Sequence, residues 1–351
     1  MTWPLRSAAL RYNRDSFPTA DLATSEGSRA VSRTGGIFTI ATGLAVALAA
    51  CRGGPPASDD AFPTEPIDLV VPFAAGGAAD LAARAFADGL SSAVGQPVVV
   101  VNRDGASGTI GGSAVASAAP DGYTLGFVPG GVLTSQPHVI ETTYDLDAFS
   151  YVCQVTERFL LVSGRADGAF ESMADVVTAA RANPGAVTYG HPGVGSFPHL
   201  FMEQLAAAAD IELTAVPFRG DAQSVTNLLG GHITLAATAE GSIAGQQVRP
   251  LGVFAASRLE RMPDVPTLSE SGYDVTTSIP TGVIAPAGVP ANVLATLESG
   301  CRAAYESEAF LAMVDRTFQL PTFAGGAAFG ARAVADSAVM RDVVSALGLG
   351  R

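Results

Sequence analysis

The stretch V-V-P-F-A-A-G-G-A-A-D-L at residues 70–81 has the residue types of an anion-binding turn. An apolar strand runs into the first turn, residues 72–80, and a helix is expected to start directly after it. The first N–H groups of a helix have no partner within the helix, so such a turn offers them to an anion. It therefore predicts a binding site for a phosphate or a carboxylate.

A carboxylate fits the first turn better than a phosphate does. The dinucleotide-binding pattern G-x-G-x-x-G is absent, and the chain has no Lys to complete a P-loop. Asp80 is expected to cap the helix, and its charge would repel a doubly charged phosphate but tolerate a carboxylate or pair with an amine. A cap remote from any ligand is the alternative for Asp80.

Two further turns between strands and helices carry polar residues. The second turn, residues 190–199, reads G-H-P-G-V-G-S-F-P-H. The third turn, residues 217–222, reads P-F-R-G-D-A, and its Arg219 could bind a ligand carboxylate or form a salt bridge. Because Val-Pro-Phe occurs in both the first and the third region, we expect two similar half-molecules with helix N-termini facing across a cleft.

The residue spacing gives little support to catalysis or metal binding. Ser196 and His199 could serve an α/β hydrolase as nucleophile and base, but Pro198 stands where the G-x-S-x-G motif needs its second Gly. This enzyme remains an alternative. The four His residues and the acids show no metal-ligand spacing, and no cofactor is expected. The turns therefore predict a site that holds a carboxylate without transforming it.

The elements that position these turns form an alternating series from Pro66 onward. Alternation of short apolar runs with helical patterns predicts an α/β fold with mostly parallel sheets, whose ligands bind at the carboxyl ends of strands. The expected strands are 67–73, 98–101, 124–128, 151–155, 159–162, 187–189, 213–218, 233–237, 251–255 and 281–285. The expected helices are 80–94, 109–118, 173–183, 199–209, 222–229, 291–306 and 325–347.

Residues 1–50 have the character of an export leader. The apolar run 37–50 suits a signal peptide and is short for a membrane span. Residues 1–28 do not fit a signal peptide, so we expect the true start nearer Val31. The run ends in Leu-Ala-Ala-Cys51, which resembles the lipobox of bacterial lipoproteins, where the Cys carries the lipid. An ordinary secretory signal with an incidental Cys is the alternative, and residues 51–61 would form a flexible tether.

Composition limits the remaining functions. With 48% hydrophobic and 15% charged residues, the chain can bury a large core. The net charge of −13 and the absence of a basic patch argue against nucleic acid as a partner. Outside the cytoplasm, Cys153 and Cys301 would favour a disulfide, and two buried free thiols are the alternative.

The segment from residue 66 to about residue 337 resembles the substrate-binding proteins of tripartite tricarboxylate transporters, the Bug or TctC-like family. Order and spacing of the motifs agree over this segment. The motifs are P-I-D-L-V-V-P-F-A-A-G-G-A-A-D (66–80), G-Q-P-V-V-V-V-N-R-D-G-A-S-G-T-I-G (95–111), A-A-P-D-G-Y-T-L (118–125), Y-G-H-P-G-V-G-S-F-P-H-L (189–200), V-P-F-R-G (216–220), L-L-G-G-H-I (228–233), M-P-D-V-P-T-L-S-E-S-G (262–272) and I-A-P-A-G-V-P (284–290).

The resemblance implies a two-domain periplasmic-binding-protein (Venus-flytrap) fold that closes around a small carboxylate. Domain I would comprise residues 62–163 and 284–351, and domain II residues 164–283. A Cys153–Cys301 disulfide would tie the first passage of domain I to its return. The implied partners are the membrane subunits of a tripartite transporter. We expect a monomer held by its lipid at the outer face of the cytoplasmic membrane, or in the periplasm.

The resemblance also implies that the first turn cradles a ligand carboxylate through main-chain N–H groups and ordered water. A loop after the strand 124–128 would line the same side, and the second turn would contribute from the other domain. The expected ligand-binding residues are Phe73, Ala74, Ala75, Gly76, Gly77, Asp80, Pro129, Gly130, Gly131, Val132, His191, Pro192, Gly193, Gly195, Ser196, His199, Arg219 and Thr238.

This chain departs from the family pattern at several of these positions. His191 and Pro192 replace small polar residues, Val132 stands where Thr is common, and Thr238 where Asp is common. Fewer hydroxyl groups predict a less polar carboxylate than a compact polyhydroxy tricarboxylate. A sensing role, in which the liganded protein docks on a receptor kinase without transport, is the alternative to delivery to a transporter.

Overall fold

The computed structural model describes residues 62–218 and 220–350 of the 351-residue chain. The described residues all belong to one compact unit. The expected signal segment, Cys51 and the tether up to residue 61 lie outside the described residues, and so does Arg219. No helix in the described ranges combines the length and the apolar character that a membrane span requires.

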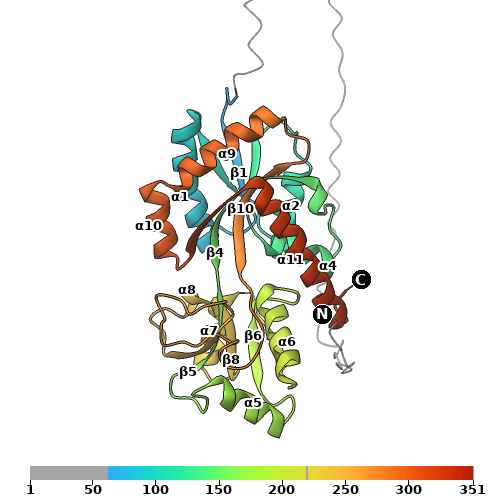
Figure 1. Ribbon diagram of the computed structural model, residues 1–351, viewed down its shortest axis with the longest axis vertical. Coiled ribbons are helices and arrows are strands. Elements are labelled where there is room, and N and C mark those ends of the chain that lie inside the picture. Colours follow the sequence, from blue (N-terminus) through green and yellow to red (C-terminus); the bar gives the residue numbers. More distant parts are fainter. Residues whose placement is uncertain (1–61, 219, 351) are drawn as a thin grey trace, which may run out of the picture. The chain divides into compact units, whose positions relative to one another are not determined.

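The first sheet has six strands in the order β11-β4-β10-β3-β1-β2 (Figure 1). β1 is parallel to β2 and β3, whereas β10 is antiparallel to β3 and β4, and β11 is antiparallel to β4. The sheet is mixed, not mostly parallel as expected, because β10 enters it at the end where β4 leaves it. The strands are β1 (Ile67–Val71), β2 (Val98–Asn102), β3 (Thr124–Pro129), β4 (Phe149–Arg158), β10 (Ile279–Pro286) and β11 (Leu320–Gly325).

The second sheet has five strands in the order β7-β6-β8-β5-β9. β6 is parallel to β7 and β8, whereas β5 is antiparallel to β8 and β9, so this sheet is mixed as well. The strands are β5 (Leu160–Arg165), β6 (Thr188–His191), β7 (Thr214–Pro217), β8 (Leu235–Ala239) and β9 (Val248–Val253).

The chain passes between the two sheets twice. It leaves the first sheet at Arg158 and enters the second at Leu160, and it returns between Val253 and Ile279. The expected domain division after residue 163 falls inside β5. We therefore propose residue 159 and the segment 254–278 as the domain boundaries.

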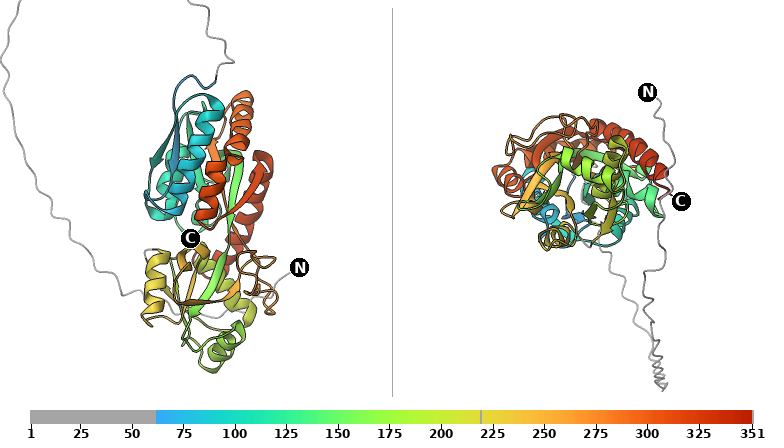
Figure 2. Two further views of the ribbon diagram at one scale, coloured as in Figure 1. Left: turned by 90° about the vertical axis from the view of Figure 1, so that its left-hand side faces the viewer. Right: turned by 90° about the horizontal axis from the view of Figure 1, so that it is seen from below.

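Helices cover both faces of the first sheet (Figure 2). One face packs in a core with Phe86, Phe127 and Phe310 against α1 (Ala78–Val94), α9 (Ala291–Tyr305) and α10 (Glu308–Arg316). The opposite face packs around Val128, Ile284 and Phe329. Its helices are α2 (Thr109–Ala116), α3 (Gly131–Thr134) and α11 (Gly326–Ala346), with α4 (Gln136–Val139) following α3. Two 3₁₀ turns, Ala106–Gly108 and Leu146–Ala148, complete the connections.

The second sheet is covered in the same way. One face forms a core with α5 (Met173–Ala182) and α6 (Phe197–Ala209), and the other contacts α7 (Asp221–Leu229) and α8 (Glu240–Ile243). The C-terminal helix α11 belongs to both halves, since Phe329 lies in a core of the first sheet while Met340 and Val344 lie in the core of the second.

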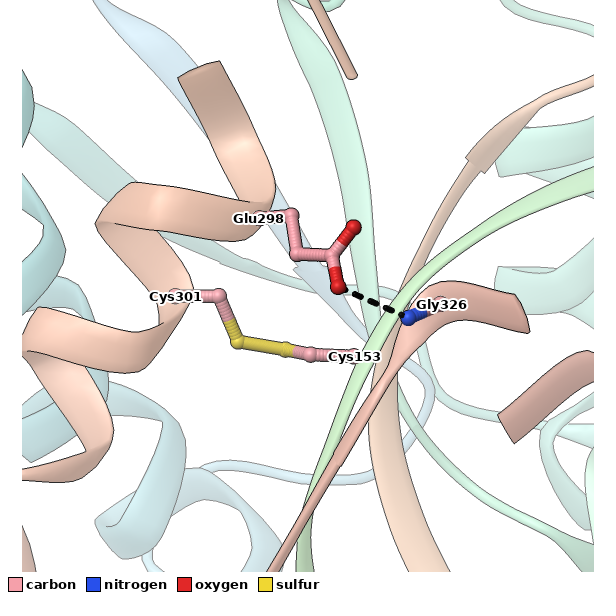
Figure 3. Close-up of a disulfide and its surroundings, with 4 residues drawn as sticks. All are labelled: Cys153, Glu298, Cys301 and Gly326. Atoms are coloured by element: carbon pink, nitrogen blue, oxygen red, sulfur yellow. Dashed lines mark hydrogen bonds between the residues drawn. A yellow bond between two sulfur atoms is a disulfide. The ribbon is translucent and has the colours of Figure 1, made fainter. Parts of the chain in front are cut away.

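Cys153 and Cys301 form a disulfide between β4 and α9, with their Cα atoms 6.6 Å apart (Figure 3). Next to it, the Gly326 N–H at the start of α11 donates a hydrogen bond of 3.3 Å to the Glu298 carboxylate. Both cysteines are buried in the core shared with α1. The disulfide therefore joins the first passage of the chain through this sheet to the helix that covers it after the return.

Candidate functional site

The two sheets share a unit of three parallel strands, β2-β1-β3 in the first and β7-β6-β8 in the second. The central strand of each unit leads through a Gly-rich turn into a helix. β1 leads through the first turn to α1, and β6 leads through the second turn to α6. The second turn is therefore the counterpart of the first. The Val-Pro-Phe match to the third turn was misleading, because that turn follows the edge strand β7.

The carboxylate of Asp80 organises the first turn. The sequence had predicted Asp80 as the cap of this helix, but the N-cap of α1 is Gly77, and Asp80 is the third residue of the helix. Asp80 Oδ2 accepts hydrogen bonds from the Gly76 N–H (2.9 Å) and from Arg84 Nε (3.0 Å). Oδ1 accepts from Arg84 Nη2 (2.9 Å) and from Asn102 Nδ2 (2.9 Å). Since a carboxylate offers about four acceptor positions, the protein itself occupies them all.

Asn102, at the carboxyl end of β2, ties the two ends of the first turn together. Its Nδ2 donates to Asp80 and also to the Phe73 carbonyl at 3.0 Å. Its Oδ1 accepts from Arg84 Nη2 at 3.1 Å. Asn102 was missing from the expected site, although a single polar residue that ends the run V-V-V-V-N was a usable signal.

Asp80 is buried but remains ionised. Burial alone would raise the pKa of Asp80, but hydrogen bonds from Arg84, Gly76 and Asn102 and the charge of Arg84 outweigh it and hold the pKa below its usual value. The Asp80 side chain is 2% exposed and that of Arg84 is 50% exposed. The negative charge of Asp80 next to the turn is thus balanced by the positive charge of Arg84.

The outer part of the first turn is open to solvent. Ala74, Ala75, Gly76 and Gly77 are exposed, and Gly76 has a φ of +86°, a conformation that favours glycine. The Gly76 N–H is committed to Asp80. Within the described residues, the N–H groups of Ala74, Ala75 and Gly77 form no hydrogen bond. These three donors remain available to an anion.

The expected loop after β3 is largely helical. Pro129 ends β3, the Gly130 N–H donates to the Pro280 carbonyl at 2.7 Å, and α3 begins at Gly131. Val132 is 2% exposed and belongs to the same core cluster as Phe73. Its side chain therefore packs in the core on which Phe73 of the first turn rests.

Two stacked histidines brace the second turn. The rings of His191 and His199 are 4.4 Å apart between centroids, with an interplanar angle of 15°. His191 Nδ1 lies 2.7 Å from the Gly193 carbonyl oxygen, which fits a proton on Nδ1. His199 Nδ1 accepts the Gly195 N–H at 3.0 Å. Gly193 and Gly195 have φ values of +130° and +72°, so the histidines hold a backbone that requires glycine.

Both imidazoles are neutral near pH 7. Burial lowers the pKa of His191 to about 4, although its hydrogen bond to Gly193 acts in the opposite direction. Burial, together with the neighbouring His191, lowers the pKa of His199 to about 3. Neither ring therefore supplies a positive charge to an anionic ligand.

This geometry does not support the hydrolase alternative. A nucleophilic serine needs a base within hydrogen-bond distance. The Ser196 hydroxyl is buried and has no hydrogen-bond partner among the described residues, while His199 Nδ1 is occupied by the Gly195 N–H. A base with a pKa of about 3 is also poorly matched to neutral pH. Across the described ranges, His, Cys, Asp and Glu side chains form no group that could hold a metal ion.

The region after β3 contacts the second turn directly. Gln136 Nε2 on α4 donates to the Gly195 carbonyl at 3.1 Å, and Gly131 lies so close to the Phe197 ring that an added Cβ would be 3.0 Å from it. Between the first and the second turn themselves, the described residues form no hydrogen bond. The structure thus links Gly131 with the second turn and leaves the first turn separate.

The remaining expected residues lie in the second half. Pro192 is partly buried beside His191. Thr238, on β8, is completely buried, and its hydroxyl has no hydrogen-bond partner among the described residues. The third turn contributes Asp221, whose carboxylate accepts from the Ser242 hydroxyl at 3.2 Å.

Comparison with known proteins gives a family match. Residues 82–348 match the TctC family, the tripartite tricarboxylate transporter family receptor. A UPF0065 protein from the gbd 5' region of Cupriavidus necator is 33% identical over 272 residues, which cover 76% of this chain and 81% of that protein. Protein BugT of Bordetella pertussis is 32% identical over 287 residues, covering 78% of this chain and 84% of BugT.

Solved structures show the same fold. The structure of R. palustris Rpa4515 with adipate has a TM-score of 0.73 and 30% identity, covering 82% of this chain and 99% of that one. MatC from Rhodopseudomonas palustris with bound malate has a TM-score of 0.70 and 25% identity, covering 81% of this chain and all (100%) of MatC.

These matches confirm the two-domain periplasmic-binding-protein fold that the sequence motifs predicted. The chain belongs to the TctC family of tripartite tricarboxylate transporter receptors, which are solute-binding receptors and not enzymes.

Proposed function

We propose that the protein captures a small carboxylate outside the cytoplasm and delivers it to the membrane subunits of a tripartite tricarboxylate-type transporter. The observation that carries this proposal is the first turn, where three exposed N–H groups lie over the ionised cluster of Asp80, Arg84 and Asn102. Membership of the TctC family and the adipate and malate bound to two structural relatives support the choice of ligand class.

Asp80 acts in this proposal as a positioning residue. Its carboxylate has no free acceptor position for a ligand amine, and its negative charge is paired with Arg84. A ligand carboxylate can therefore approach the N–H groups of Ala74, Ala75 and Gly77 without facing an uncompensated anion. The second turn and the unpaired hydroxyls of Ser196 and Thr238 would contact the ligand from the other half.

The character of the second turn defines the kind of carboxylate. His191 and His199 are buried as neutral, stacked rings beneath the turn, and the partly buried Pro192 adds an apolar ring beside them. Such a wall favours an aliphatic spacer over a densely hydroxylated one. We expect the ligand to be a carboxylate with a partly apolar skeleton.

Native mass spectrometry of freshly purified protein, followed by calorimetry, tests this function. The calorimetric panel contains adipate, malate, citrate, inorganic phosphate and a neutral amino acid. We expect a carboxylate to bind and phosphate to give no heat. Tightest binding of citrate would overturn the prediction of a partly apolar ligand, and binding of none of the carboxylates would overturn the function.

Uptake measurements distinguish delivery to a transporter from sensing. Cells that lack the gene should take up the identified carboxylate, supplied with a radioactive label, more slowly than the parent strain. Unchanged uptake together with loss of a transcriptional response to the carboxylate would favour a receptor-kinase partner instead.

We also propose that residues 1–50 are removed on export and that Cys51 carries the lipid, a region outside the described residues. Labelling with an alkyne fatty acid should mark the wild-type protein and not the Cys51→Ser variant. Equal labelling of the two proteins would contradict lipid attachment at Cys51. A mature protein that begins at Cys51 without label would indicate an ordinary secretory signal.

A further inference from the structure

Arg158 lies between the carboxyl ends of the parallel strands of both sheets. In the first sheet, β3 ends at Pro129, and Pro129 pairs with Thr281 of β10. Arg158 of β4 pairs with Ile279, which lies two residues before Thr281 on the same strand β10. In the second sheet, β8 ends at Ala239, which pairs with Leu160, two residues after Arg158. Arg158 is thus roughly 7 Å beyond both strand ends, in the region where α/β sheets bind their ligands.

The guanidinium of Arg158 lacks a hydrogen-bond or ion-pair partner within the described residues, although the charge of Asp221 acts on it. Its Nε is buried and donates no hydrogen bond to any acceptor there, and none of the ion pairs within those residues includes Arg158. Two other arginines near the strand ends are paired, Arg84 with Asp80 and Arg332 with Glu157. Arg158 differs from these two in that its buried Nε has no hydrogen-bond partner.

A guanidinium whose buried Nε has no hydrogen-bond partner is an incomplete arrangement. Arginine keeps its charge in proteins, and a buried charge without hydrogen-bond partners is unfavourable. Burial lowers the pKa of Arg158, and attraction by Asp221 only partly offsets this effect. Asp221 accepts hydrogen bonds from Ser242 and from the Ala239 backbone, so its carboxylate is already held at the start of α7. A further anion at Arg158 would complete its hydrogen bonding.

We propose that Arg158 binds a second carboxylate of the ligand, so that the substrate class is the aliphatic dicarboxylates. This inference rests on the proposed function, because it assumes that the first turn holds one carboxylate. The planar guanidinium can hold the other carboxylate through two parallel hydrogen bonds, which a Lys could not reproduce. Neutral rings of the second turn then face the apolar spacer between the two groups.

Matched ligand pairs isolate the contribution of Arg158. Calorimetry compares succinate with butyrate, glutarate with valerate, and adipate with hexanoate, so that each pair differs by one carboxylate at constant chain length. The wild-type protein should bind at least one dicarboxylate about 10- to 100-fold more tightly than its monocarboxylate, as expected for a charge-assisted pair of hydrogen bonds.

The variants test whether Arg158 causes that difference. Arg158→Met should remove most of the preference for the dicarboxylate and leave the affinity for the monocarboxylate nearly unchanged. Arg158→Lys keeps the charge but not the planar fork, and should retain only part of the preference; it also provides the test if Arg158→Met does not fold. Arg165→Met removes an exposed arginine that is paired with Asp167, and should leave the preference intact.

The outcomes separate this inference from the proposed function. A wild-type protein that binds monocarboxylates and dicarboxylates equally would overturn the role of Arg158 and leave the function standing. An undiminished preference in Arg158→Met, or in Arg158→Lys where only that variant folds, would do the same. Failure of the wild-type protein to bind any of these acids would overturn both.

Discussion

At the scale of single residues, Asp80 illustrates how a buried acid can prepare a site for another acid. Its oxygens hold Gly76, Arg84 and Asn102 at hydrogen-bond distances, so the turn is shaped before any ligand arrives. Preorganised donors cost little rearrangement on binding. Asp80 thus contributes to ligand binding indirectly, by fixing the backbone of the first turn.

Asp80→Asn should destabilise both the fold and the site. The new amide would place N–H donors against the donors of Arg84 or Gly76, with loss of charge-assisted hydrogen bonds worth about 2 kcal/mol. Urea denaturation should show this loss, and calorimetry about a tenfold weaker affinity for the carboxylate. The matched control is Asp167→Asn, which alters an exposed pair with Arg165. Equal effects of the two substitutions would contradict the role of Asp80.

His199 should make the stability of the fold depend on pH. Its folded-state pKa of about 3 lies below the value of about 6.5 in an unfolded chain, so the unfolded state binds the proton first. The stabilising contribution is therefore present above pH 6.5 and is lost as the pH falls, by about 2 kcal/mol at pH 5.

His199→Gln keeps an acceptor for the Gly195 N–H but cannot be protonated in this range. The difference in unfolding free energy between wild type and this variant should change by about 2 kcal/mol between pH 7.5 and pH 5. His232→Gln, which alters an exposed imidazole, is the control and should follow the wild type. If the difference in unfolding free energy between wild type and His199→Gln did not change with pH, the proposed role of His199 would be wrong.

The first two turns were predictable from sequence, whereas the positions of Asn102 and Arg158 at strand ends were not. Gly and Pro mark the first two turns whatever the sheet order, and the family motifs point to the same residues. Asn102 and Arg158 act at the ends of β2 and β4, and their neighbours depend on which strands are adjacent. That order is set by long-range pairing, which one strand's sequence does not contain.

At the scale of elements, most strands and helices were found within a few residues, and the failures have physical causes. β11 was missed because Pro321 lacks the N–H that a strand interior needs, and the structure accommodates it at the sheet edge, where β4 is the one neighbouring strand. α10 was also missed, and it begins after α9 with only Glu306 and Ser307 between them. The parallel character was overestimated because alternation does not reveal strands that return from another sheet.

The disulfide should be a large single contributor to stability. Cys153 and Cys301 are 148 residues apart, and closing so long a loop restricts the unfolded chain by roughly 4–5 kcal/mol in entropy terms. The double variant Cys153→Ala/Cys301→Ala should lose about 4 kcal/mol in urea denaturation. A reducing agent should lower the stability of the wild type and not that of the variant. Reactive thiols at both positions in the unfolded, unreduced protein would refute the bridge.

At the scale of the whole molecule, one arginine of α11 contacts both crossings of the chain between the two sheets. Arg332 Nη2 contacts Glu157 of β4 at 2.7 Å and the Ser278 hydroxyl just before β10 at 2.6 Å. Ser278 also donates to Glu157, and Gln154 accepts from Arg332 Nη1 at 3.2 Å. Arg332 therefore contacts the end of β4 and the start of β10, the two places where the chain leaves and re-enters the first sheet.

Because α11 lies in both cores, the described halves should unfold together in one calorimetric transition. Arg332→Met leaves Glu157 without its cation and should lower the unfolding free energy by about 2 kcal/mol, less than for a fully buried pair, since Arg332 is 29% exposed. Arg341→Met on the same helix, which alters an exposed pair with Asp342, should have no effect. Two separate transitions in the wild type would contradict the coupling.

The order of strands in the first sheet also determines when that sheet can be finished. All five strands of the second sheet fall between residues 160 and 253, whereas β4 has only β10 and β11 as neighbours. During synthesis from the N-terminus, the second sheet can therefore complete its hydrogen bonding before residues 279–286, the strand β10 that pairs with β4, have been made. Chains interrupted before that point expose an unpaired strand, the kind of surface on which aggregation begins. We therefore expect chains that end before residue 279 to aggregate more readily than the complete chain.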